Sequence, residues 1–477
     1  MEAGILLGVA VCIVALFVRW EREGQEQRAP LGLLALLAVE ATIYADPTGL
    51  PRGIFHPGSG STQLRLPEIY ITLALVARLI ARGKPSRIGL PAALWLAFGA
   101  WMTVGAVEGA LYHNLISIDL YEAKSIIYIV GAYALAAGVP VRRYLDSGDL
   151  FKLGALCVVF ASVLDVMSIG HVVVNRNVPL LPLQNFGEIG AETAAIFLAV
   201  GTMCFLCRLA SGSARIRHVL ALIPLVASVV LAGQRAVLVN LGLVVLVVLV
   251  VLVVTYRRGI VRRLHVGLGQ LMLTVLAVVA VGMVVVVVPA AVEQRPVPVP
   301  LASNFQDLFH SEAKAESAQD RLNLAASAEA LIPQHLIIGW GLGVELQYYE
   351  TGSHMTLTIP YAHNIVLDLW LRLGIIGLVL FLVALVASIV DGLRVWRRHP
   401  EPETAALALA IVAVLVGLMA SALLEPLIDE YRLVTLFGVS IGMLRAAVTS
   451  MGGAQPLPGW RTEATPLNVA AGGVKWT

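Results

Sequence analysis

Residues 361–378 read Tyr361-Ala-His363-Asn364-Ile-Val-Leu-Asp368-Leu-Trp-Leu-Arg372-Leu-Gly374-Ile-Ile-Gly377-Leu, and this stretch joins a long polar segment to an apolar one. The apolar segment runs from about Ile365 to Val390, which is long enough to cross a bilayer at about 1.5 Å per helical residue. Pro360 lies just upstream, and Asn364 has a side chain suited to cap a first helical turn. The stretch therefore predicts a transmembrane helix that begins at Asn364.

One face of this helix carries a histidine and two glycines. At helical spacing, a single stripe contains His363, Leu367, Trp370, Gly374 and Gly377. The glycines would allow a neighbouring helix to approach closely below the histidine. The imidazole would lie at the membrane surface beside the positive end of the helix dipole, where it could handle an anionic headgroup. The alternative is an interfacial histidine in an ordinary span, which this stretch taken alone favours.

The composition of the chain excludes a soluble globular protein. Of its 477 residues, 58% are hydrophobic and 13% are charged, and the mean hydropathy is +0.84. The net charge of +2 indicates no particular partner. All four cysteines lie in apolar segments, and Cys204-x-x-Cys207 has no His or acidic residue nearby. We therefore expect neither a disulfide framework nor a metal site at the cysteines.

Apolar segments of membrane-spanning length recur along the chain. They predict an all-α, polytopic integral membrane protein of about 12–13 transmembrane helices, with one large, partly helical extracytoplasmic loop. The first segment could also be a signal-anchor-like addition. The segments are Ala3–Val18, Leu31–Ala45, Leu66–Ala81, Ile88–Val107, Tyr121–Val139, Leu153–Ile169, Ile189–Cys207, Val219–Leu231, Ala236–Thr255, Val266–Val288, Ile365–Val390, Ala405–Leu424 and Val434–Ala447.

Lys and Arg gather in every second loop, as they do between Arg257 and Arg263, whereas the other loops contain mostly single basic residues. The basic loops are expected in the cytoplasm, which places the long segment before His363 outside. Four regions follow from this orientation. They are N-terminal transmembrane helices over 1–288, an extracytoplasmic loop or lid over 289–363, C-terminal transmembrane helices over 364–448 and a disordered cytoplasmic tail over 449–477.

The predicted extracytoplasmic loop is large enough to hold structure of its own. Alternate prolines over Pro296–Pro300 predict an extended spacer. Residues Ser311–Ile332 are rich in Ala, Glu and Leu, and they predict an amphipathic helix that contains Arg321. Pro333 should end this helix, and the glycines of Gly339–Gly343 predict a compact turn. The loop could cover a membrane-embedded site, or it could be a solvated cap without a chemical role.

Two basic side chains lie at the predicted outer ends of spans. Gln234-Arg235 separates two apolar segments with almost no loop, so Arg235 is held at the outer membrane boundary. A guanidinium there is costly unless an anion pairs with it, which favours a binding role over snorkelling to lipid phosphates. Lys124 follows Glu122 and Asp119 closely, and a local Glu–Lys pair accounts for it adequately.

Three blocks of sequence occur in a fixed order along the chain. They are Gln234-Arg235-Ala236 between two spans, Arg321 followed by Pro333-Gln-His-Leu-Ile-Ile-Gly339-Trp-Gly341-Leu-Gly343, and His363-Asn364 followed after nine residues by Gly374-x-x-Gly377-Leu. Together with the topology they resemble the O-antigen ligase and polymerase superfamily of polytopic membrane glycosyltransferases. That family has a Ser-Arg-Gly/Ala hairpin, an Arg … His-Pro-Leu-x-Gly-x-Gly block and the His-Asn signature. The resemblance covers about Leu220 to Val390 well and the earlier spans by topology.

The chain departs from the family pattern at two positions. Gln234 stands where Ser is usual, and it lacks the hydroxyl group through which that Ser could make a contact. Arg372 stands where an acidic residue is frequent, and this difference bears on either helix packing or the preference for an acceptor. A thirteenth span would also exceed the usual twelve.

The resemblance implies a reaction and the residues that perform it. The family moves a glycan from an undecaprenyl-pyrophosphate carrier to an acceptor hydroxyl on the outer face of the membrane. His363 is the expected catalytic base, because an imidazole can take up a proton near neutral pH. Arg235 and Arg321 are the expected pyrophosphate ligands, because guanidinium groups are always charged and bind phosphate in a bidentate way. Further candidate site residues are Asn364, Lys124 and Asp368.

The implied partners are an undecaprenyl-pyrophosphate-linked glycan donor, a glycan or lipid-glycan acceptor and the lipid bilayer, without nucleic acid. No cofactor is expected, and no metal either, because the loop contains no Asp-x-Asp pair that would hold a divalent ion. The expected location is the bacterial cytoplasmic (inner) membrane, with the site facing the extracytoplasmic side.

Two other functions stay open. A polymerase of the same superfamily would extend a lipid-linked chain, and these motifs do not separate it from a ligase. A lipid-linked glycan flippase or other transporter belongs to a different class and should have two repeated halves and charged residues near mid-membrane. The sequence has no such internal repeat, and its ionisable residues cluster at one face.

Overall fold

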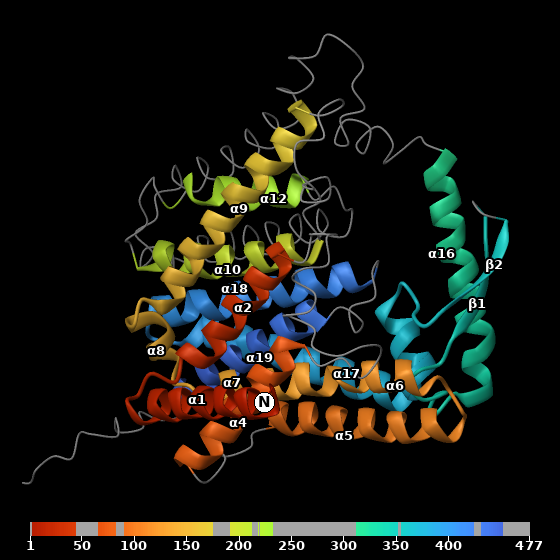
Figure 1. Cartoon of the computed structure of the whole chain (residues 1–477), viewed down its shortest axis with the longest axis horizontal. Helices are drawn as coiled ribbons and strands as arrows, with labels where there is room; N and C mark the ends of the chain where they lie inside the picture. The colour runs from red at the N-terminus through yellow and green to blue at the C-terminus, as the bar shows by residue number, and fades with distance from the viewer. Residues whose placement is uncertain are drawn as a thin grey trace, which may run out of the picture.

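The structure is a computed structural model of the whole chain, and it shows a polytopic membrane protein that is almost entirely helical (Figure 1). The predicted all-α fold class is confirmed. Two predicted spans, Ala236–Thr255 and Val266–Val288, lie outside the described residues, so the total number of spans stays a prediction. The structure describes residues 2–43, 65–82, 90–174, 191–211, 218, 220–231, 312–351, 354–423 and 431–451.

The described elements fall into three groups along the chain. The first contains α1 (Glu2–Arg22), α2 (Arg28–Ile43), α4 (Leu66–Arg82), α5 (Leu90–Leu111), α6 (Ile116–Ala123), the π-helical turn η2 (Ile127–Gly131), α7 (Ala132–Ala137), α8 (Val141–Asp146), α9 (Asp149–Val174), α10 (Ala191–Ala210) and α12 (Leu222–Leu231). The second contains α16 (Glu312–Leu331), the 3-10 turn η4 (Ile332–His335), β1 (Leu346–Glu350) and β2 (Met355–Ile359). The third contains α17 (Ile365–Arg398), α18 (Pro402–Ala422) and α19 (Tyr431–Met451).

Five helices in the described part of the chain are long and apolar enough to cross a membrane. One of them runs from Ile116 to Ala137 and combines α6, η2 and α7, so the span predicted at Tyr121 begins earlier and contains a π-helical turn. The last helix continues to Met451, past the end predicted for it. The five are Pro91–Leu111, Ile116–Ala137, Ile365–Arg398, Pro402–Ala422 and Tyr431–Met451.

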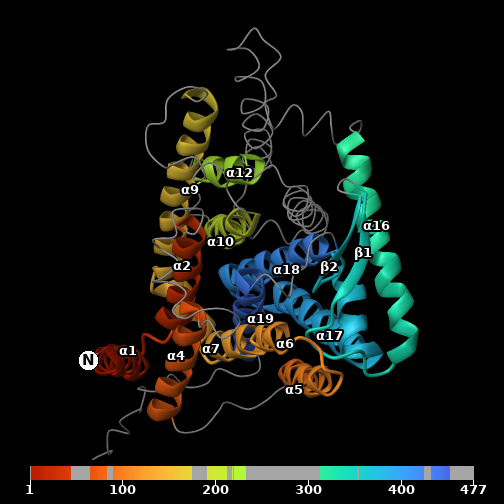
Figure 2. The same ribbon diagram turned by 45° about the vertical axis from the view of Figure 1, so that its right-hand side comes forward.

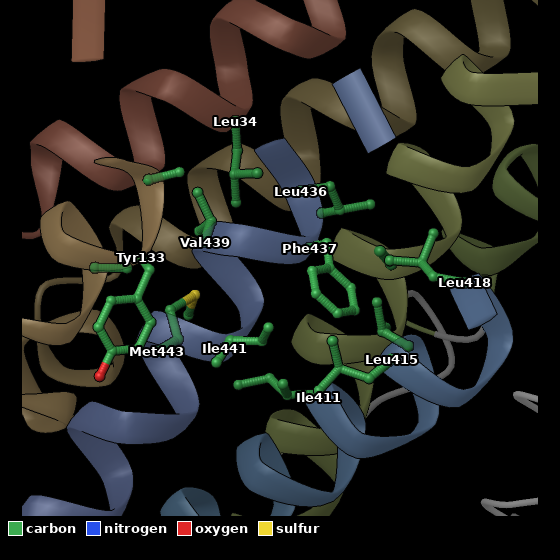
Figure 3. Close-up of a cluster of buried hydrophobic side chains, with 14 of the residues drawn as sticks. Leu34, Tyr133, Ile411, Leu415, Leu418, Leu436, Phe437, Val439, Ile441 and Met443 are labelled. Carbon is green, nitrogen blue, oxygen red and sulfur yellow. The ribbon is translucent and has the colours of Figure 1, made fainter. Parts of the chain in front are cut away.

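Helix α19 lies in the middle of the bundle and is buried along most of its length (Figures 1 and 2). It packs against α7, α17 and α18, and its apolar side chains interlock with theirs. Figure 3 shows this core, where Phe437 lies between α18 and α19. The labelled side chains are Leu34, Tyr133, Ile411, Leu415, Leu418, Leu436, Phe437, Val439, Ile441 and Met443.

Two glycines bring α19 into backbone contact with η2 and α7. A Cβ atom on Gly438 would lie 2.7 Å from the carbonyl oxygen of Ile129, and one on Gly442 would lie 2.6 Å from that of Tyr133. Glycines four residues apart allow this kind of close helix packing in membranes. Helix α19 thereby fixes the position of the α6–η2–α7 span, whose first turns face the site described below.

Residues 312–362, which we call the lid, lie against one end of the bundle. Helix α16 crosses the ends of α5 and α17 and does not run beside them (Figures 1 and 2). The helix predicted over Ser311–Ile332 is confirmed, but its apolar residues are not confined to one face, since Leu324 and Ala328 are buried while Leu322 is exposed. The lid has a small apolar core, completed by Leu371 of α17. Its lid residues are Leu324, Ala328, Ile332, Val344, Leu346 and Ala362.

A β-hairpin that the sequence did not indicate completes the lid. Strands β1 and β2 pair antiparallel, with Leu346 opposite Ile359. Helix α16 supports β1 through polar side chains, since Asn323 Nδ2 donates to Tyr349 O at 2.9 Å and Ser327 Oγ donates to Gln347 O at 2.7 Å. The helix and the hairpin therefore form one unit, from which the chain returns to the bundle at His363.

Candidate functional site

His363 lies directly before α17, where the lid joins the bundle. The side-chain oxygen of Asn364 accepts hydrogen bonds from the backbone N–H groups of Val366 (2.9 Å) and Leu367 (3.3 Å). The predicted N-cap is therefore confirmed, and it fixes the backbone next to His363. The imidazole is half-buried, and its ring meets that of Tyr361 edge-on, with 5.4 Å between the centroids.

Arg321 lies on α16 and is partly buried. Burial, and after it the positive charge of Arg321, lower the pKa of His363 from its ordinary value of 6.5. The lid helix and the helix junction thus contribute to one electrostatic site. Because the neutral imidazole is favoured, His363 can accept a proton at neutral pH.

Of the other candidate residues, the structure describes Lys124 and Asp368 but not Arg235. Arg235 lies outside the described residues, so its expected place beside the same site stays a prediction. Lys124 Nζ lies 3.5 Å from Glu68 Oε1, an ion pair with α4 that the sequence did not indicate. Asp368 is buried in the first turn of α17, and its Oδ1 accepts a hydrogen bond from the N–H of Ala362 at 3.1 Å. Asp368 therefore holds the backbone directly before His363.

Gly374 interrupts α17 with a backbone conformation of φ 64° and ψ −174°. A Cβ atom at this position would lie 2.1 Å from Ile337 O, which only glycine avoids. Next to it, the N–H of Ile375 donates to Leu336 O at 3.0 Å. The neighbour at Gly374 is thus a turn of the lid, and the prediction that a helix approaches there is wrong.

Gly377, one turn later, lies against α5, as the predicted helix contact requires. A Cβ atom on Gly377 would lie 3.0 Å from Trp101 Cδ1. The indole N–H of Trp101 donates to Leu373 O at 2.8 Å, so a side chain of α5 binds the backbone of α17 at the kink. The two glycines therefore admit different neighbours, the lid at Gly374 and α5 at Gly377.

Residues 336–343, which we call the glycine turn, enter the space between α5, α6 and α17. Gly339, Gly341 and Gly343 all have positive φ angles, of 85°, 80° and 76°. The closest approach is at Gly341, where a Cβ atom would lie 2.1 Å from the backbone nitrogen of Gly109 in α5. The compact turn predicted from the glycines is confirmed, and its spacing of alternate glycines is what allows backbone to pack on backbone.

Partners on three helices bind the backbone of the glycine turn. The N–H groups of Trp340, Gly341, Leu342 and Gly343 donate to Leu371 O (2.8 Å), Arg372 O (3.0 Å), Gly105 O (2.9 Å) and Glu122 Oε2 (2.8 Å), in that order. Asn114 Nδ2 donates to the carbonyl oxygens of Trp340 and Leu342, each at 2.9 Å. Irregular backbone can lie at membrane depth only when its polar groups are bound by protein in this way.

Two buried ion pairs lie beside the glycine turn. Arg372 Nη1 is 2.9 Å from Glu122 Oε2, and Arg372 Nη2 is 3.0 Å from Asp368 Oδ1. The sequence marked Arg372 only as a departure from the family pattern. The one-turn spacing of Asp368 and Arg372 could have indicated their pairing. Glu122 lies on a distant span, and nothing in the sequence connects it to Arg372.

Among the described residues, no group of three or more His, Cys, Asp or Glu side chains is placed to hold a metal ion. Metal independence stays a prediction.

A comparison with protein families finds a match over residues 220–382, to the family described as O-Antigen ligase. The matched range contains Arg235, Arg321 and His363, together with the glycine turn and the kink of α17. A comparison with curated proteins finds no match. The family match and the spans support a multi-pass membrane protein with the general function of an O-antigen ligase or polymerase.

Proposed function

Because residues 220–382 match the O-Antigen ligase family, we propose that the chain belongs to the O-antigen ligase and polymerase superfamily and is a ligase-type membrane glycosyltransferase. It moves a glycan from an undecaprenyl-pyrophosphate carrier to the hydroxyl of a glycan or lipid-glycan acceptor. The reaction takes place at the extracytoplasmic face of the cytoplasmic membrane, without a cofactor or a metal.

The observation that carries the proposal is the pairing of a neutral base with a fixed cation at the junction of lid and bundle. His363 has a pKa below its ordinary value because it is half-buried and lies within the field of Arg321. A base must be unprotonated to act, and a pyrophosphate leaving group needs positive charge near its oxygens. One site therefore supports both requirements.

In the proposed step, the acceptor oxygen bonds to the anomeric carbon while the bond from that carbon to the phosphate oxygen breaks. The acceptor's proton passes to His363, and the electron pair of the broken bond stays on undecaprenyl pyrophosphate. Arg321, and Arg235 from outside the described residues, bind the oxygens on which negative charge develops, because a planar guanidinium fits two phosphate oxygens at once.

The test is transfer by the purified protein in nanodiscs, with a defined lipid-pyrophosphate glycan and an acceptor. His363→Gln should keep donor binding and lower the single-turnover rate about 10²–10⁴-fold, because the imidazole no longer takes the proton. The matched control is His354→Gln on the exposed hairpin turn, which should keep the parental rate. A strong chelator should also leave the rate of the parent unchanged.

Near-normal turnover of His363→Gln would move the base role to another residue. Lost donor binding with a normal rate at saturation would place His363 among the phosphate ligands. Rate loss on chelation, restored by one specific metal, would contradict metal independence. The same assay separates a ligase from a polymerase, because a polymerase lengthens the lipid-linked product while a ligase releases a glycan on a different acceptor.

A further inference from the structure

The ion network of Glu122, Arg372 and Asp368 takes no part in the step proposed above. It lies between the segment that leads to His363 and the glycine turn of the lid. The side chains of Arg372 and Glu122 are 1% and 0% exposed, so both charges are removed from water. The two carboxylates that pair with Arg372 come from different elements, Glu122 from α6 and Asp368 from α17. A network of this kind needs an explanation, because buried charges are costly and apolar side chains of similar size often stabilise a fold as well or better.

One side of the network holds the segment that leads to His363. Arg372 Nη2 donates to Pro360 O and pairs with Asp368 Oδ1. The same Asp368 oxygen accepts the N–H of Ala362 at 3.1 Å. The backbone is therefore held at two of the three residues before His363, and Asn364 caps the helix immediately after it. These directional bonds determine where the imidazole can lie.

The other side of the network holds the lid. Glu122 Oε2 accepts the N–H of Gly343 at 2.8 Å, and the carbonyl oxygen of Arg372 accepts the N–H of Gly341 at 3.0 Å. From there the indole N–H of Trp340 donates to Leu331 O at 3.0 Å, at the last residue of α16. The network thus connects α16, which carries Arg321, to the segment that carries His363.

We propose that Arg372 is a positioning residue: together with Glu122 and Asp368 it sets the placement of His363 relative to Arg321. This inference rests on the proposed function, because it assigns the network a role in that reaction. Apolar side chains could fill the same volume, but they would not bind Pro360 O, Ala362 N–H and Gly343 N–H in fixed directions. Specific geometry at the site is what the buried charges provide.

The test removes all three charges and keeps the side-chain oxygens that accept hydrogen bonds from the backbone N–H groups. In the neutral variant Glu122→Gln/Asp368→Asn/Arg372→Met, the amide oxygens still accept from Gly343 and Ala362, and no unpaired charge is left buried. A single Arg372→Lys variant keeps the charge and loses the planar fork. The matched control is Glu21→Gln/Arg78→Met, which removes another partly buried pair (2.8 Å) that joins α1 to α4.

The neutral variant should fold and bind donor, and its single-turnover rate should fall about 10–100-fold, the loss typical of a misplaced reacting group. Arg372→Lys should lie between this variant and the parent. The control pair should lower the thermal midpoint by a similar amount and keep the parental rate. Parental turnover in the neutral variant, or an equal rate loss in the control, would overturn the proposal.

A second readout is independent of catalysis. The ring of His363 is labelled and its pKa is followed by NMR in nanodiscs, with its signal assigned by the loss seen in His363→Gln. Arg321 on α16 and Tyr361 on its own segment lie around the ring. In the neutral variant the pKa of His363 should rise toward 6.5, because the ring moves relative to Arg321, and in the control it should not change. An unchanged pKa would refute positioning even if His363 proved not to be the base.

Discussion

At the scale of residues, the positive charge of Arg321 has two effects in the proposed site, one on the pyrophosphate and one on the pKa of His363. In the proposed reaction the charge of Arg321 binds the pyrophosphate, and, after burial, the same charge lowers the pKa of His363 and so favours its neutral form. A bound pyrophosphate would offset that charge, so the pKa of His363 would rise when the donor is in place. Proton uptake by the imidazole would then become more favourable at the stage when the acceptor hydroxyl must lose its proton.

The charge of Arg321 and its planar shape can be separated by substitution. Arg321→Gln should raise the pKa of His363 toward 6.5, so the acid limb of the profile of kcat/KM against pH should move to higher pH, because more of the base is protonated at a given pH. Arg321→Lys should leave that limb in place and weaken donor binding, since the charge remains and the fork is lost. An identical acid limb in the parent and Arg321→Gln would contradict the coupling between the two residues.

At the scale of elements, the glycine turn is the part of the lid that the bundle holds most closely. Gly109 of α5 leaves room for its backbone, since a Cβ atom there would lie 2.2 Å from Leu342 O, and a Cβ atom on Gly341 would lie 2.1 Å from Gly109 N. These contacts are backbone on backbone, so no side chain can move aside to relieve a clash. The turn therefore tolerates no added atoms at its closest points.

Gly341→Ala should lower both the thermal midpoint and the transfer rate strongly, because its Cβ would lie 2.1 Å from the backbone of α5. Gly148→Ala is the matched control. Gly148 also has a positive φ, of 69°, and a Cβ there would meet nothing within 4 Å. It should cost only the backbone strain of about 1–2 kcal/mol and keep the transfer rate. Equal behaviour of the two variants would show that the turn is not tightly packed.

Local patterns predicted the elements whose signals lie within the element itself. Asn364 indicated the start of α17, and the composition of 311–332, rich in Ala, Glu and Leu, indicated α16. The hairpin was not predicted, because its strands are only five residues long and are held by α16. Glu122 could not be connected to Arg372 from the sequence, because their contact depends on packing between distant spans.

At the scale of the whole molecule, the arrangement of the spans decides which side of the membrane carries the site. The lid lies at one end of the bundle (Figure 2), and His363 lies where the lid joins the first turn of α17. The basic residues between Arg394 and Arg398 lie at the other end of α17, where the distribution of charge predicts cytoplasm. All of the proposed chemistry depends on this orientation, because the donor glycan is expected outside.

Single cysteines in a Cys12→Ser background test the orientation. Cysteines at Leu322 and Met355, which are 63% and 60% exposed on the lid, should react with an impermeant thiol reagent on intact cells whose outer envelope has been permeabilised. A cysteine at Lys152, whose side chain is 74% exposed, should react only after the inner membrane is opened. The reverse pattern would place the lid in the cytoplasm and remove the site from the donor.

The anchoring of the glycine turn also limits which segments of the protein can be exchanged with those of a relative. Residues 312–362 look like a separable insert, with a helix, a hairpin and a small core. Their attachment points nevertheless belong to α5 and α6, which precede the insert by some two hundred residues of chain, as shown by the bond from Leu342 N–H to Gly105 O and that from Gly343 N–H to Glu122. A graft that transfers the insert to a relative must therefore carry the matching faces of α5 and α6 with it.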